Sequence, residues 1–160
     1  MDEIERRQKL ETFGNTYFAI RESLVQYPKE MWHFKPSSDQ WSIHEIITHI
    51  TDSEAHAYIR FRKAIAESGS KITFYNQENW ANFLNYSNQN SDHILELFKW
   101  LRAISYDLLR SLSESDWQNT IIHPERGSLT LEQLLESNIT HIERHSSQMR
   151  NVFEAWQKSQ

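Results

Sequence analysis

The sequence predicts an all-α protein, a single four-helix bundle spanning residues 1–160. Four long segments carry apolar residues at spacings of three and four, the period of one helix face. The chain has only three glycines and three prolines, too few for a sheet protein built on tight turns. No segment shows the alternation of period two that marks a strand, and no internal repeat is present. A chain of this length can bury a core of its own, so we expect one domain.

The first two helices are predicted from apolar spacing and from start and stop signals. The first is expected over residues 2–27 and ends at Pro28, which cannot continue a helix. The second is expected over residues 43–67, because Ser42 can cap it while Glu45, three residues on, reaches back to the cap. The apolar stripe of the first helix consists of Leu10, Phe13, Tyr17, Ile20 and Leu24.

The last two helices follow the same logic. We expect the third over residues 91–112 and the fourth over residues 131–156. Thr130 and Gln133 repeat the start signal of the second helix, which places the beginning of the fourth at Leu131. The apolar stripe of the third helix is predicted to be Ile94, Leu97, Leu101, Ile104 and Leu108.

The connections are long for a simple up-and-down bundle. Residues 69–79 are expected to form a loop, followed by a short helical turn at 80–84, and residues 113–128 a long irregular connection. Such loops often build the mouth of a site, so loop aromatics are candidates for a pocket: Phe74, Tyr75 and Trp80. Other aromatics at helical spacing are expected to pack in the core: Phe13, Tyr17, Phe61, Phe98, Phe153 and Trp156.

Composition excludes several classes of function. With 22 acidic and 17 basic residues and no run of lysine or arginine, the chain lacks the charge of a nucleic-acid binder. The absence of cysteine excludes disulfides and thiolate ligands and suits a reducing cytoplasm. The acidic N-terminus has no apolar run behind it, so we expect no signal peptide, no membrane partner and a cytoplasmic location. No Gly-rich phosphate loop or Gly-x-Ser-x-Gly elbow is present.

Two predicted helices carry polar stripes beside their apolar faces. One stripe consists of His49, Ser53, His56 and Arg60, and the other of Asn138, His141, His145 and Gln148. Imidazoles turned toward a core need partners, because burying an unpaired polar group is unfavourable. A divalent cation bound by His49, His141 and His145 would satisfy all three and leave the open position of a catalytic zinc.

Other interpretations of these histidines stay open. A histidine pair four residues apart is common on helix surfaces, where it binds nothing. His56 is a candidate fourth ligand or proton carrier, although a surface position is favoured. His44 is not expected to join the site, because it is five residues from His49 and is turned from it by about 140°.

Three segments together resemble the DinB-like superfamily, most closely its YfiT branch of metal-dependent hydrolases and bacillithiol S-transferases. They are Trp41 to Glu54, Tyr58 to Arg62, and His141-Ile142-Glu143-Arg144-His145, within a resemblance that covers roughly residues 15–155. The resemblance implies a four-helix bundle that binds one nickel or zinc ion through the positions matching His49, His141 and His145. It also implies a homodimer, since members often form dimers.

The resemblance implies an enzyme that activates a low-molecular-weight, bacillithiol-like thiol as a metal-bound thiolate and conjugates it to electrophiles. The alternatives are a metal-dependent hydrolase that uses bound hydroxide and a metal-binding bundle without catalysis. We expect Arg60 to hold a carboxylate of the thiol, with a salt bridge to a neighbouring helix as the alternative. Glu54 is expected either to orient a ligand imidazole or to pair with a buried arginine or tyrosine.

Overall fold

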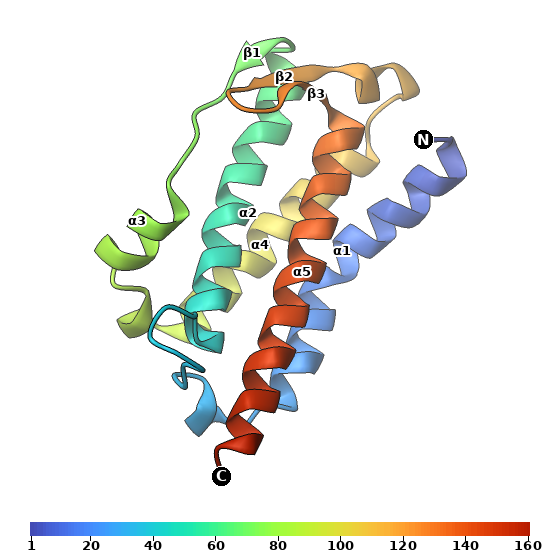
Figure 1. The fold of residues 1–160 in the computed structure, drawn as a ribbon. Helices are drawn as coiled ribbons and strands as arrows, with labels where there is room; N and C mark the ends of the chain where they lie inside the picture. The colour runs from blue at the N-terminus through green and yellow to red at the C-terminus, as the bar shows by residue number, and fades with distance from the viewer.

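The computed structural model describes residues 1–160 and shows a bundle of four long helices (Figure 1). They are α1 (Glu3–Val25), α2 (Ile43–Ala66), α4 (Ser91–Arg110) and α5 (Leu131–Lys158). Both α1 and α2 pack against α4 and against α5, so α1 lies diagonally across the bundle from α2. The predicted fold class is confirmed, and the helix ends lie within two residues of the predicted ones. None of the helices combines the length and apolar character that a membrane span requires.

Capping boxes fix the starts of α2 and α5, as predicted. Ser42 Oγ accepts a hydrogen bond from the Glu45 amide at 3.2 Å, and the Glu45 carboxylate accepts one from the Ser42 amide at 2.9 Å. Thr130 and Gln133 make the same two bonds at 3.3 and 2.9 Å. The first residue of each helix therefore follows from local chemistry, and so do the directions in which later side chains point.

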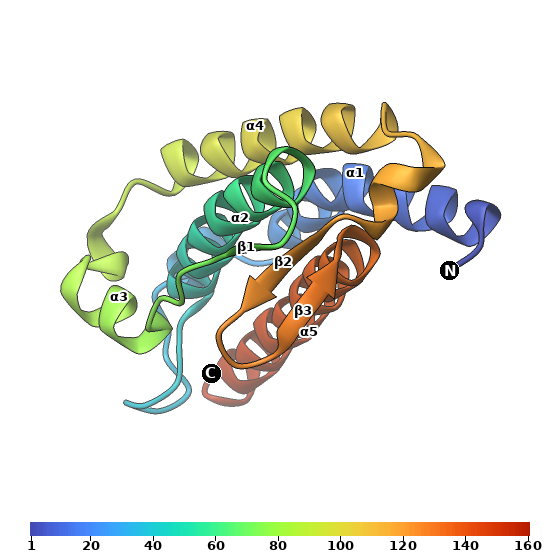
Figure 2. The same ribbon diagram turned by 90° about the horizontal axis from the view of Figure 1, so that it is seen from above.

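A three-stranded sheet crosses one end of the bundle, over the ends of α2 and α5 (Figure 2). Its order is β1 (Ser70–Lys71), β2 (Thr120–His123) and β3 (Gly127–Thr130), with β1 parallel and β3 antiparallel to β2. The sequence shows no pattern of period two for these strands, because strands of two to four residues are too short to show one.

Both long connections are more regular than predicted. Residues 113–128 begin with a 3₁₀ helix at Glu114–Gln118 and continue into β2 and its hairpin turn, where Gly127 has φ 72°. The short helix α3 (Gln77–Phe83) begins three residues before the predicted turn, because the Asn76 side chain caps it by accepting from the Asn79 amide at 2.9 Å. Two further 3₁₀ turns lie at Lys29–Met31 and Tyr86–Asn88.

The buried face of α4 differs from the predicted stripe. Leu97 and Ile104 are 51% and 47% exposed. The face that packs into the bundle is instead Ile94, Leu95, Phe98, Arg102, Ser105 and Leu109. Apolar spacing pointed to the wrong face because the buried one includes an arginine whose partner, Glu54, lies on α2.

The core consists of two apolar clusters stacked along the bundle. One contains Ile50, Phe98 and Ile142, and the other contains Phe61 and Leu135. Of the aromatics expected to pack, three are fully buried and three partly buried: Phe13, Phe61 and Phe98, then Tyr17, Phe153 and Trp156. Between the clusters lies a polar layer contributed by α2, α4 and α5: Glu54, Arg102 and Asn138.

Candidate metal centre

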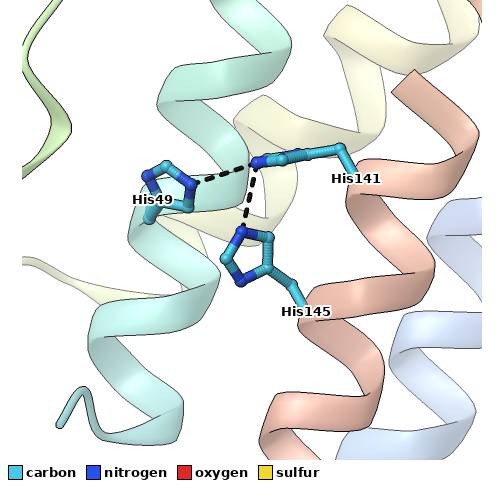
Figure 3. A group of neighbouring side chains, drawn as sticks. All are labelled: His49, His141 and His145. Carbon is cyan, nitrogen blue, oxygen red and sulfur yellow. Dashed lines mark hydrogen bonds between the residues drawn. The ribbon is translucent and has the colours of Figure 1, made fainter. Parts of the chain in front are cut away.

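Three imidazoles from two helices meet in the bundle (Figure 3). His49 comes from α2, and His141 and His145 come from successive turns of α5. Nε2 of His141 lies 3.2 Å from Nε2 of His49 and 3.1 Å from Nε2 of His145, and the three ligand atoms all lie within 4.8 Å of one another. Tetrahedral zinc with Zn–N bonds of about 2.0–2.1 Å places its nitrogens roughly 3.3–3.4 Å apart. The cluster therefore fits one divalent ion.

The protonation of the cluster also suits a metal. Nδ1 of His145 donates to Oε1 of Gln148 at 2.8 Å, so Nε2 of the neutral ring keeps its lone pair for the cluster. Burial lowers the pKa of His49 and of His141 to about 3, and repulsion from His145 adds to the effect in both. The pKa of His145 is lowered by burial as well. All three rings are neutral near pH 7, which is the form that binds a metal.

Trp41 covers one side of the cluster. Its ring centroid lies 4.8 Å from that of His49 and 6.4 Å from that of His145, where the two rings are stacked. On another side His141 borders a cavity of about 650 Å³ between α2, α5, the loop before α3 and the β2–β3 hairpin. A small molecule in this cavity would therefore approach the imidazoles from the His141 side.

A pair of hydroxyl groups links the cavity to the cluster. Ser53 Oγ lies 2.6 Å from the Tyr75 hydroxyl and 3.5 Å from Nε2 of His49. Phe74 and Tyr75 line the cavity, as predicted, whereas Trp80 lies in α3 against His56. The closeness of Tyr75 to Ser53 was not predicted, since nothing in the sequence relates a loop residue to a helix 22 positions earlier.

The other residues of the α2 stripe have different surroundings. Arg60 lines the cavity, and its Nε is buried without a hydrogen-bond partner. It forms no salt bridge, so the alternative of an ion pair with another helix is not seen. His56 is half-buried rather than on the surface, because its ring stacks on Tyr75 with the centroids 4.1 Å apart. It is not part of the histidine cluster, and so it is not a fourth ligand there.

Glu54 forms no hydrogen bond with any of the three histidines. Its Oε2 accepts hydrogen bonds from Arg102 at 2.7 Å and from Asn138 at 3.2 Å. Pairing with a buried arginine, one of the two expected roles, is confirmed, and the orientation of a ligand imidazole is not seen. Desolvation raises the pKa of Glu54, and the positive charge of Arg102 opposes that rise. His44 stacks on His33 with the centroids 4.4 Å apart, outside the cluster, as predicted.

Comparisons with known proteins agree with the fold, and the relatives they identify are described as metal-dependent. A protein of Oceanobacillus iheyensis named "putative metal-dependent hydrolase" is 31% identical over 112 residues, which are 70% of this chain and 64% of the relative. A Bacillus mycoides protein of the same description is 30% identical over 71% of this chain and 65% of its own length. The matched region thus spans slightly less than two thirds of these relatives.

Two solved structures share the fold. YfiT from Bacillus subtilis, described as a probable metal-dependent hydrolase with an unusual four-helix bundle topology, superposes with a TM-score of 0.88 at 18% identity, over 95% of this chain and 87% of YfiT. A mycothiol-dependent maleylpyruvate isomerase superposes with a TM-score of 0.71 at 13% identity, over 93% of this chain and 61% of the isomerase. The family match itself extends over residues 14–149, and this chain therefore belongs to the DinB superfamily.

Proposed function

We propose that this protein is a metal-dependent thiol S-transferase, in which His49, His141 and His145 hold one zinc or nickel ion. The observation that carries the proposal is a cluster of three neutral imidazoles, without a fourth protein ligand, beside a cavity. An ion with three neutral ligands keeps its full charge and lowers the pKa of a thiol that occupies its open position.

The residues around the cluster favour a thiol over water as the nucleophile. A bound metal lowers the pKa of its water, and in many hydrolases of this kind a carboxylate base also helps to remove the proton. The carboxylates of α2 near the site are already engaged, Glu54 by Arg102 and Asp52 by the Tyr86 hydroxyl at 2.5 Å. A thiol near neutral pH loses its proton more readily than water and needs no such base.

Arg60 has a role in binding rather than in bond making. Its guanidinium lines the cavity without a protein carboxylate to neutralise it. A planar fork of donors suits a carboxylate, and we propose that Arg60 binds a carboxylate of the thiol. The fold shared with a mycothiol-dependent enzyme supports a thiol as the co-substrate.

The test begins with the metal content of the purified protein and of the His49→Ala and His145→Ala variants, with His93→Ala as a control at an exposed position outside the site. We expect one ion per chain in the wild type and in the control, and a loss of that ion in the other two. Equal metal content in all four proteins would refute the metal site.

The second step separates a transferase from a hydrolase. The cobalt-substituted protein is titrated with N-acetylcysteine, and absorption in the near ultraviolet is followed. A new sulfur-to-cobalt charge-transfer band supports thiol transfer. An unchanged spectrum up to millimolar thiol would refute it and would leave the hydrolase as the better function.

A further inference from the structure

Two guanidiniums and an imidazole lie at the hairpin end of the cavity, away from the histidine cluster. Arg60 of α2, His123 of β2 and Arg126 of the β2–β3 turn all line this cavity. These three groups lie close enough for the charge of one to shift the pKa of another. The pKa of Arg60 is lowered by burial and by Arg126, and Tyr75 opposes this shift. The pKa of His123 is lowered by burial and by both arginines, and the carboxylate of Glu125 opposes this shift. Two segments distant in sequence thus bring the like charges of Arg60 and Arg126 together, which is unfavourable unless an anion joins them.

The protein pairs neither arginine with such an anion. Neither Arg60 nor Arg126 forms an ion pair, and the only side-chain partner of Arg126 is Ser137 Oγ at 3.0 Å. The two carboxylates that border the cavity, those of Glu78 and Glu125, are exposed. The partly buried guanidinium of Arg60 therefore lacks an acceptor for its Nε–H, which is unfavourable until a ligand provides one.

His123 is prepared to donate rather than to accept. Its Nδ1 accepts from the backbone amides of Glu125 and Arg126 at 3.2 and 3.3 Å. In the neutral ring the proton is therefore on Nε2, so the imidazole adds a donor to those of the two arginines. The backbone of the hairpin turn thus fixes the tautomer of His123, which lines the cavity.

We propose that Arg60, His123 and Arg126 form a subsite for the carboxylate or phosphate group of an elongated small-molecule substrate, whose reacting atom lies at the histidine cluster. The identity of the reacting end rests on the proposed function. The subsite itself requires no metal, because none of its three residues belongs to the cluster.

Helix geometry limits the length of that substrate. Arg60 lies eleven residues beyond His49 on α2, a rise of roughly 16 Å at 1.5 Å per residue. On α5, Ser137, which anchors Arg126, precedes His141 by four residues, or roughly 6 Å. The anionic group and the reacting atom are therefore separated by several bonds. A molecule as short as mercaptoacetate occupies one end of the cavity only.

Metal-free protein provides the test. The ¹H–¹⁵N resonance of the Arg60 Nε, assigned by its loss in Arg60→Gln, is followed while succinate and inorganic phosphate are added in separate titrations. We expect a saturable shift of this resonance with at least one anion. The anion that binds more tightly shows whether the subsite prefers a carboxylate or a phosphate group. In Arg126→Gln the dissociation constant should be roughly tenfold higher, as for the loss of one charge-assisted contact. Arg62→Gln, on the same helix but outside the cavity, should leave it unchanged.

Two results would overturn the subsite. One is the absence of any Arg60 shift up to saturating concentrations of both anions, and the other is equal affinity in the wild type and Arg126→Gln. Because the anion titration is done without metal, a negative result there does not change the interpretation of the N-acetylcysteine titration of the cobalt-substituted protein. Failure of the metal experiment likewise leaves an anion subsite standing.

Discussion

The buried ion pair between Glu54 and Arg102 gives the sharpest prediction about stability. The two side chains are 0% and 1% exposed, and their charged atoms lie 2.7 Å apart. Arg102 also donates to Asn138 at 2.7 Å, so the network joins α2, α4 and α5. Replacing Arg102 by methionine leaves a carboxylate buried without its counter-charge. Removal of one partner of such a pair costs about 3–5 kcal/mol.

A double-mutant cycle separates the pair from its surroundings. Each of Arg102→Met and Glu54→Met strands one buried charge, whereas the double variant strands none and fills the space with apolar atoms. We expect the double variant to be more stable than either single variant, with a coupling free energy of about 3 kcal/mol. The assay is urea unfolding followed by far-ultraviolet circular dichroism, with EDTA present so that metal binding does not contribute.

The pH dependence has a definite sign. Desolvation already raises the pKa of Glu54 in the folded protein, and loss of Arg102 raises it further. A carboxyl whose pKa is higher folded than unfolded binds a proton more tightly in the folded state. Stability therefore falls as the pH rises through the interval between the two pKa values. The deficit of Arg102→Met should therefore grow as the pH rises above the usual range of a carboxyl group and should shrink as the pH falls toward that range. Single variants that cost under about 1 kcal/mol, or a double variant equal to the sum of the singles, would refute this reasoning.

Three further predictions concern the metal and the helix packing. Zinc at about a hundred times its dissociation constant should stabilise the wild type by about 2.7 kcal/mol, seen as a higher melting temperature in scanning calorimetry and absent from His145→Ala. Gln148→Ala removes the acceptor of His145 Nδ1–H and should weaken zinc binding about tenfold to a hundredfold in a chelator competition, whereas the neighbouring Ser147→Ala should not. Gly14→Ala places a Cβ 2.8 Å from Cδ2 of Tyr106, so it should lower stability to urea by about 1–3 kcal/mol despite the better helix propensity of alanine.

The sequence predicted those parts of the fold that local chemistry determines. Ser42 with Glu45 located the start of α2, and Thr130 with Gln133 located that of α5, because a capping box involves residues only three apart. Once both starts are known, helical periodicity directs His49 inward from α2. The same reasoning applies to His141 and His145 on α5, so their convergence was predictable.

Features that depend on partners distant in sequence escaped prediction. The buried face of α4 includes Arg102, and a charged residue is assigned to the surface unless its partner on another helix is known. The hairpin strands of four residues carry no periodic signal. The neighbours of Arg60 were missed for the same reason, since His123 and Arg126 join it only through that hairpin.

Trp41 shows how a local start signal also shapes the site. It immediately precedes the Ser42 cap, and its ring packs against both His49 and His145. The formation of the capping box therefore places an indole over one side of the imidazoles, while His141 faces the cavity. Arg60 and Tyr75 line the same cavity as His141. If Arg60 binds an anion as proposed, recognition of that anion and access to the imidazoles share one cavity.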